Sequence, residues 1–226
     1  MPFQLELRHE VLGYTGHYAR PALELWGSGG VIIQGMLDAL GPHGVRLQHI
    51  QVTGSGANAS ETLVTAQVPS VGTVKFAFDK LEFNFANFTQ AFFEAIPKTM
   101  DGLVAWMVKA VPDFKFASHK FSYFCHSFVK DSTPQEALRA VNARELKSAG
   151  ISLGNGAIFN YTVPSKSWQT QLLIDKSHHL VGGLFISLEL QIHTGKIDYA
   201  QVVLDGRKYL ADALAELGLM IPEASA

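Results

Sequence analysis

The order of apolar and polar residues predicts an α+β fold in which antiparallel sheets are each covered by helices. Short segments of alternating apolar and polar residues, typical of half-buried strands, recur along the 226 residues, and segments with helical spacing follow them. The order strand, short helix, several strands, long helix occurs twice. It predicts two tandem β-α-β(n)-α units over 1–111 and 112–226. No residue-level repeat accompanies this order, so a coincidence and a single fused domain stay open as alternatives.

The first half begins with an alternating segment over 3–12 and a second extended segment over about 17–26. A glycine-rich stretch follows, and apolar residues at helical spacing then predict a short helix over about 30–40. Four strands are expected after this helix, over 45–53, 61–68, 73–78 and 80–86.

Two helical pieces are expected at the end of the first half. Asn87 stands in an N-cap position and Gln90 completes a capping box, which predicts a helix over 88–96. Pro97 interrupts that helix, because proline lacks the backbone N–H that a helix interior needs, and a second piece is expected over about 99–110.

The second half opens with a long strand or a hairpin over 113–130. The clearest helix start in the chain comes next, where Thr133 caps, Pro134 takes the first helical position and Glu136 completes a capping box. This pattern predicts a helix over about 134–147.

Three more strands and a last helix complete the second half. The strands are expected over 156–163, 167–175 and 180–193. Asp198 caps the last helix, Gln201 stands in the box position, and Gly218 ends the helix.

The composition indicates apolar surface that must be covered. Hydrophobic residues make up 47% of the chain, whereas charged residues make up only 17%, against about 25% in ordinary globular proteins. An oligomer interface, a protein partner or an internal ligand would each cover such surface.

Charge and hydropathy argue against nucleic-acid binding, a membrane span and secretion. The net charge is −2, and the lysines and arginines are scattered, so nucleic-acid binding, which needs a clustered basic face, is not expected. No run approaches the ~18 apolar residues of a membrane helix, and no signal peptide opens the chain. We therefore expect a cytoplasmic protein without a membrane span.

Common catalytic motifs fail when they are tested residue by residue. The glycine-rich stretch 27–30 has Ile32 where a dinucleotide fingerprint needs glycine or alanine, and no lysine follows for a P-loop. Neither Ser28 nor Ser55 fits a Gly-x-Ser-x-Gly elbow. The nine histidines lack metal-ligand spacing. We therefore predict no catalytic residue, no metal and no cofactor.

Cys125 is the single cysteine and lies in an apolar stretch. Its surroundings predict a small buried hydrophobe rather than a nucleophile. On a strand, the neighbouring His126 would point to the opposite face.

Four polar residues are candidates for ligand binding: His17, Arg20, Glu189 and His193. His17 and Arg20 follow the first strand and would line a polar pocket if one exists there. Glu189 and His193 share a half-polar face of the last long strand with Phe185. That face is either exposed to solvent, the usual one-sided pattern, or lines a cleft.

Three classes of function follow. The first is a non-enzymatic interaction or assembly protein, with a protein partner or as a homo-oligomer, and the sparse charge and the failed motifs favour it. The second is a binder of a small apolar ligand in a sheet–helix cavity, similar in architecture to helix-grip folds, a likeness that carries no function. The third is an enzyme with an unrecognised site built from the four polar residues above.

Overall fold

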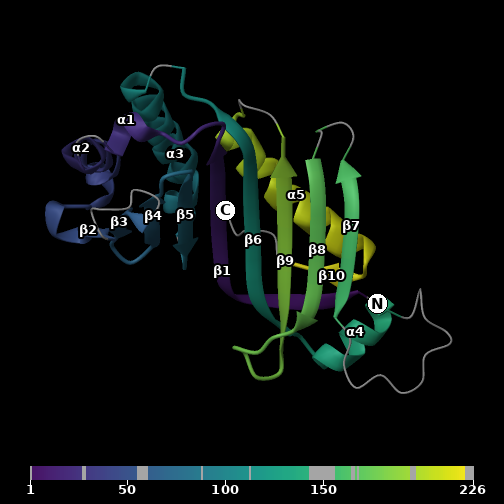
Figure 1. Ribbon diagram of the computed structural model, residues 1–226. Coiled ribbons are helices and arrows are strands. Elements are labelled where there is room, and N and C mark those ends of the chain that lie inside the picture. Colours follow the sequence, from purple (N-terminus) through teal and green to yellow (C-terminus); the bar gives the residue numbers. More distant parts are fainter. Residues whose placement is uncertain are drawn as a thin grey trace. The chain divides into compact units, whose positions relative to one another are not determined.

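A computed structural model describes residues 2–26, 29–54, 61–87, 89–111, 113–142, 156–163, 166, 168–193 and 197–221. Over these residues helices and strands are mixed, and the strands form one large antiparallel sheet (Figure 1). The α+β class predicted from the sequence is therefore confirmed.

The sheet has the strand order β2-β3-β4-β5-β1-β6-β9-β8-β7. A short β10 (Leu219–Met220) pairs in parallel with β1 (Phe3–Tyr18) outside that order. Among the strands of the described residues, the two outermost are β2 (Ile50–Thr53) and β7 (Ala157–Val163).

The chain divides into two compact units, each built from separate stretches of sequence. The first unit comprises Met1–Val11, Ser122–Leu190 and Leu204–Ala226, and the second comprises Leu12–Phe121 and Gln191–Val203. The tandem β-α-β(n)-α organisation over 1–111 and 112–226 stays a prediction.

The second unit holds most elements of the N-terminal half. They are α1 (Leu23–Trp26), α2 (Gly29–Leu40), the 3-10 turns η1 (Gly41–His43) and η2 (Leu47–His49), β2, β3 (Leu63–Val68), β4 (Gly72–Phe76), β5 (Lys80–Ala86) and α3 (Gln90–Ala110). The antiparallel pairing of β2 to β5 is continuous, with Val64 opposite Phe76 and Val74 opposite Phe83.

Helix α3 buries one apolar face in the second unit. Its fully enclosed residues recur three and four positions apart, as a helix with one buried stripe requires: Phe93, Ile96, Met100, Leu103 and Met107. Trp106 packs edge to face on Phe76 of β4, with ring centroids 5.7 Å apart. A Cβ atom at Gly35 of α2 would lie only 2.2 Å from the Trp106 indole, so this glycine permits the close packing of α2 on α3.

The expected interruption at Pro97 is wrong, because α3 runs unbroken through this proline. The Thr99 hydroxyl donates to the carbonyl of Ala95 and also contacts Nε2 of His43 at 2.7 Å. Burial of the apolar stripe on both sides of Pro97 outweighs the one backbone hydrogen bond that proline removes.

Two other expectations for the first half are also corrected. The N-cap of α3 is Thr89, whose hydroxyl accepts from the backbone N–H of Phe92, whereas Asn87 has a left-handed backbone with φ of 53°. The extended segment over 17–26 is instead the end of β1 and the helical turn α1, which buries Leu25.

The first unit holds most elements of the C-terminal half: α4 (Pro134–Asn142), β7, β8 (Trp168–Lys176), most of β9 (Gly183–Ile192) and of α5 (Tyr199–Glu216), and β10. The segment 113–130 is one long strand, β6 (Phe116–Val129), and not a hairpin. Both expected helix caps are confirmed: the Thr133 hydroxyl accepts from the N–H of Glu136, and the Asp198 carboxylate accepts from that of Gln201.

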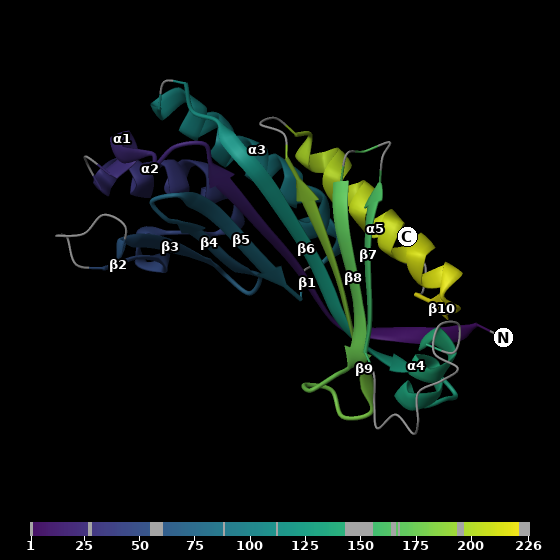
Figure 2. The same cartoon turned by 45° about the vertical axis from the view of Figure 1, so that its right-hand side comes forward.

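Helix α5 runs beside strands of the first unit (Figure 2). Tyr209 of α5 lies against Tyr161 of β7, with ring centroids 5.6 Å apart, and a Cβ at Gly206 would lie 3.0 Å from Leu190 of β9. The inward positions of β9 alternate, as predicted: Leu184, Ile186, Leu188 and Leu190 are all buried.

Several expectations fall outside the described residues. They are Ser28, Ser55 and positions 143–147 of the helix expected over 134–147. In the part of the chain that the structure describes, no helix is long and apolar enough to cross a membrane.

Candidate functional site

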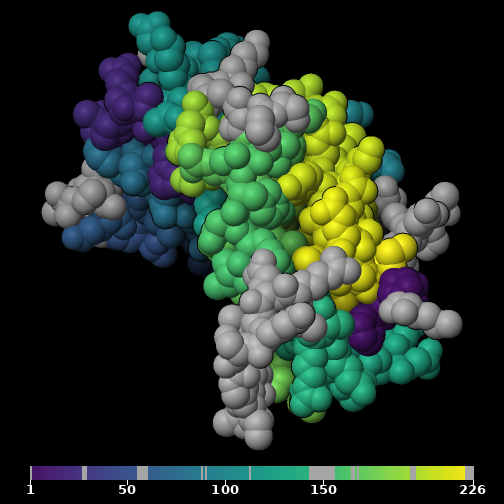
Figure 3. Space-filling model, turned by 90° about the vertical axis from the view of Figure 1, so that its right-hand side faces the viewer, coloured from purple at the N-terminus to yellow at the C-terminus, as the bar shows by residue number. Residues whose placement is uncertain are grey.

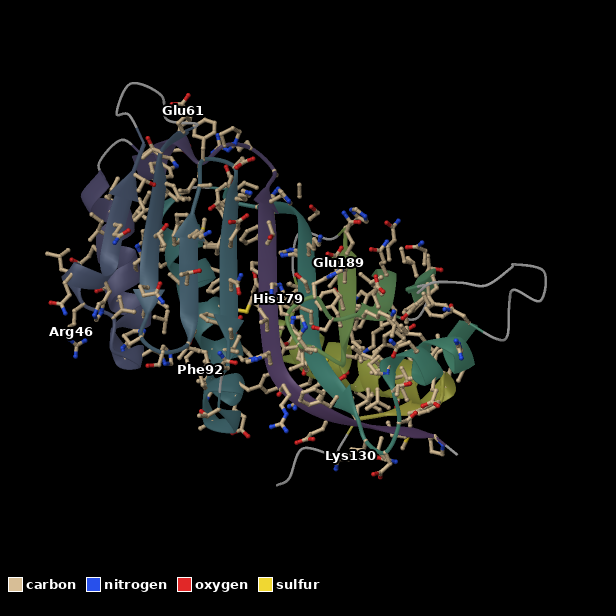
Figure 4. The ribbon with its side chains drawn as sticks, turned by 90° about the horizontal axis from the view of Figure 1, so that it is seen from below. Arg46, Glu61, Phe92, Lys130, His179 and Glu189 are labelled. Atoms are coloured by element: carbon tan, nitrogen blue, oxygen red, sulfur yellow. The ribbon has the colours of Figure 1, made fainter. Side chains whose placement is uncertain are left out.

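A cluster of histidines lies in the first unit, on the side of β9 that carries Phe185. His126 of β6 packs on Phe185 with ring centroids 5.2 Å apart. His179, in the turn between β8 and β9, meets His126 edge to face at 5.4 Å, and His9 of β1 meets it at 6.3 Å. Figure 4 labels His179 in a view from below. Two sequence-distant segments thus place imidazole rings beside one buried histidine.

Ser177 fixes the hydrogen bonding of His126. The Ser177 Oγ lies 2.8 Å from His126 Nδ1 and accepts from the backbone N–H groups of His179 and Leu180. Because these two donors occupy the lone pairs of the oxygen, the hydroxyl proton of Ser177 is left to donate to His126 Nδ1. Neutral His126 therefore carries its own proton on Nε2.

The surroundings of His126 oppose its protonation. Burial, then His179, then His9 lower the pKa of His126 below its ordinary value. Among the described residues, no group of three or more histidines, cysteines or carboxylates is arranged to hold a metal ion. The geometry of the cluster supports a neutral, hydrogen-bonded imidazole.

A second polar cluster of the first unit involves Glu10, Tyr123 and α5. The Tyr123 hydroxyl donates to the Glu10 carboxylate, and Arg207 of α5 lies 3.6 Å from the same oxygen. Cys125 is fully buried nearby, and burial followed by the charge of Glu10 raises the pKa of its thiol to about 12. Such a thiol is a poor nucleophile, as the sequence predicted.

The second unit encloses a tyrosine–histidine–tyrosine chain. The Tyr14 hydroxyl lies 2.9 Å from His119 Nδ1 and 3.1 Å from the Tyr199 hydroxyl, and all three side chains are buried. Burial raises the pKa of Tyr199 to about 12, the hydrogen bond with Tyr14 opposes this rise, and the charge of Asp101 adds to it. A Cβ at Gly16 would lie 2.3 Å from the Tyr14 hydroxyl, so this glycine makes room for the chain. The enclosure indicates a structural network.

The strand β7 forms an uncharged outer edge of the first unit. Its seven residues, AIFNYTV, pair with β8 from Ala157 opposite Ile174 to Val163 opposite Trp168. Asn160 accepts a hydrogen bond from Gln171 on β8, and the side chain of Ile158 is 60% exposed. Green atoms in the range of β7 lie at the surface beside yellow α5 in Figure 3.

The opposite edge strand, β2, is also uncharged, but it has only four residues, IQVT. Every charged residue of the strands that the structure describes lies on a strand other than β2 or β7. Edge strands are usually protected from pairing with another chain by a lysine, a proline or an inward-pointing charge. Neither β2 nor β7 contains such a residue. Being longer, β7 offers the larger set of outward backbone groups.

The four residues predicted for ligand binding lie in different surroundings. His17 and Arg20 are exposed in the second unit, where Arg20 forms an ion pair with Glu24 at 3.1 Å. His193 is exposed just after β9 in the same unit. Glu189 belongs to the first unit, where it is half-buried on the Phe185 side of β9 (Figure 4). Their role in binding stays a prediction.

Sequence reasoning missed the histidine cluster and the β7 edge. His9, His126 and His179 are far apart in the chain, and only the pairing of strands brings them together. The absence of charge in 157–163 is visible in the sequence, but its position at the end of the strand order is not.

Comparisons with known proteins supply no family. No protein-family model matches the sequence, and no curated protein matches it. A chain from the crystal structure of A. aeolicus tRNASec in complex with M. kandleri SerRS is similar at 8% identity, over 96% of this chain and 30% of that one, with a TM-score of 0.31. This chain thus spans less than a third of that chain's length, and a likeness this weak carries no argument.

Proposed function

We propose that this protein is a non-enzymatic assembly protein that associates through an edge of its sheet. The observation that carries the proposal is the uncharged strand β7 at the end of the strand order, with charges confined to other strands. Addition of a strand to a free edge is a common mode of protein recognition, in which backbone hydrogen bonds supply affinity.

The chemistry of the described side chains supports binding over catalysis. Three groups with clearly perturbed pKa values are enclosed: Cys125, Tyr14 and Tyr199 are buried, and burial raises the pKa of each of them. A buried tyrosine or thiol held in its protonated form contributes packing and hydrogen bonds rather than a base.

Exposed apolar side chains add to this support in the first unit. Ile158 of β7 is 60% exposed and Leu204 of α5 is 58% exposed. Single exposed apolar residues are ordinary on protein surfaces, so the edge strand carries more weight than these residues do.

The architecture proposed for this assembly is a pair of related β-α-β(n)-α units, each with a sheet covered by helices on one face. The element order supports the pairing of units, because β1 to α3 and β6 to α5 both run from a strand through helix and antiparallel strands to a long helix. The contact of α3 with Phe76 and that of α5 with Tyr161 support the covering by helices.

Light scattering coupled to size-exclusion chromatography tests the proposed function. We expect the mean mass to rise above that of one 24.7 kDa chain as the concentration increases. A single-chain mass over the whole accessible concentration range would contradict self-assembly.

A further inference from the structure

We propose that β7 pairs with β7 of a second copy of this chain, antiparallel and centred on Asn160, so that the two sheets continue into each other. This inference rests on the proposed function and names its partner. The first reason is self-complementarity, because a two-fold interface brings the same surface of both copies together, so that this surface must be complementary to itself.

The sequence of β7 meets that requirement. With Asn160 opposite itself, Phe159 stands opposite Tyr161 of the other copy and Ile158 opposite its Thr162. Aromatic pairs and β-branched pairs are favourable cross-strand neighbours, whereas like charges directly opposite each other are unfavourable. The strand has no charged residue, so no such repulsion arises.

The register follows from the two faces of the strand. On β7, Ile158 and Asn160 are exposed, whereas Tyr161 packs against Tyr209 of α5. Directly opposite residues of an antiparallel pair have their side chains on the same face of the sheet. A continuous sheet with both α5 helices on one side therefore requires odd-numbered residues to stand opposite odd-numbered ones and even-numbered residues opposite even-numbered ones, which we call equal parity. Among such registers, the one centred on Asn160 pairs all seven residues, Ala157 through Val163.

This register also satisfies the backbone. Alternate residues of an edge strand point their N–H and C=O groups outward. Because the register pairs residues of equal parity, each outward-pointing residue of one copy meets an outward-pointing residue of the other. The outward backbone groups of 157–163 are then hydrogen-bonded along the whole strand.

The closing experiment uses charge complementation at the two-fold axis. Asn160→Lys and Asn160→Asp each place two like charges opposite each other, so each variant alone should weaken dimerisation by about two- to fivefold. An equimolar mixture of the two variants should restore dimerisation to near the wild-type level, because lysine then faces aspartate. Analytical ultracentrifugation measures all three samples.

Gln67→Lys, an exposed change on β3 in the second unit, is the matched control and should leave dimerisation unchanged. As an independent readout, Asn160→Cys should form a disulfide-linked dimer in oxidised glutathione, since directly opposite Cβ atoms approach to about 4.5 Å, the upper end of the range that a disulfide spans. Gln169→Cys on β8 should not, because it is one strand away from the axis.

The outcomes separate the two proposals. A wild-type chain that is oligomeric but unaffected by Asn160→Lys, or a mixture that fails to recover dimerisation, overturns the pairing through β7 and leaves assembly standing. A wild-type chain that is monomeric at every concentration overturns both.

Discussion

At the scale of single residues, His126 shows how packing sets the charge of a side chain. Its Nδ1 receives the hydroxyl proton of Ser177, and His179 and His9 lie around its ring. Adding a proton to Nδ1 would turn this acceptor into a donor that faces an oxygen already bonded to two N–H groups. The hydrogen bonding and the lowered pKa therefore agree in favouring the neutral ring.

The first prediction concerns the pH dependence of stability. Because the pKa of His126 is lowered in the folded protein from its ordinary 6.5, the unfolded chain takes up this proton first as the pH falls. The contribution of neutral His126 is thus fully present above about pH 6.5 and is lost below it, toward the lowered folded value. Urea unfolding at about pH 7.5 and about pH 5 should show a smaller loss in His126→Phe than in the wild type.

His17→Phe is the control for this prediction, because His17 is exposed in the second unit. It should keep the wild-type difference in stability between the two pH values. An unchanged pH difference in His126→Phe would show that the ring does not resist protonation.

At the scale of elements, helix caps have measurable effects. The Thr133 hydroxyl accepts from the N–H of Glu136, and the Glu136 carboxylate accepts in turn from the N–H of Thr133. Thr133→Ala should lower the free energy of unfolding by about 1 kcal/mol, as loss of a serine or threonine cap does. Thr53→Ala, whose hydroxyl makes only a 3.5 Å contact with the Leu63 carbonyl, should have a much smaller effect in the same denaturation assay.

Two glycine substitutions should act in opposite directions. A Cβ at Gly102 of α3 meets nothing within 4 Å, so Gly102→Ala should stabilise by about 0.5–1 kcal/mol through helix propensity. A Cβ at Gly35 of α2 would lie 2.2 Å from Trp106, so Gly35→Ala should destabilise by about 1–3 kcal/mol through overpacking. Thermal unfolding of both variants measures the two signs, and stabilisation by Gly35→Ala would refute the close packing of α2 on α3.

The sequence predicted the elements whose signals are local and missed those that depend on distant contacts. The strand over 80–86 and the caps at Thr133 and Asp198 follow from alternation and from short-range hydrogen bonding. The continuity of α3 through Pro97 could not be predicted, because burial of residues on both sides of the proline decides it.

The candidate sites were less accessible to sequence reasoning than the elements. His9, His126 and His179 become neighbours only through the pairing of strands, so no spacing along the chain indicated them. The four predicted binding residues were chosen because they are polar and share a strand or a strand face with other polar residues. Polarity alone does not show which groups surround a side chain in the folded protein.

At the scale of the whole molecule, the distribution of charge over the sheet sets how the protein should respond to salt. An association built from uncharged strands depends on backbone hydrogen bonds and apolar contact, neither of which is screened by ions. We therefore expect the mass measured by light scattering at a fixed concentration to be nearly the same at low and high sodium chloride. A large salt dependence would point to a charged interface away from β7.

The enclosed Cys125 has a practical consequence for such measurements. It is the chain's single thiol, and both its burial and its suppressed ionisation should keep it from reacting with a maleimide while the first unit stays closed. The rate of its alkylation then reports how often that unit opens. A fluorophore can accordingly be attached to a surface cysteine introduced elsewhere without removing Cys125. The slow alkylation of Cys125 then measures the opening of the first unit in the same sample.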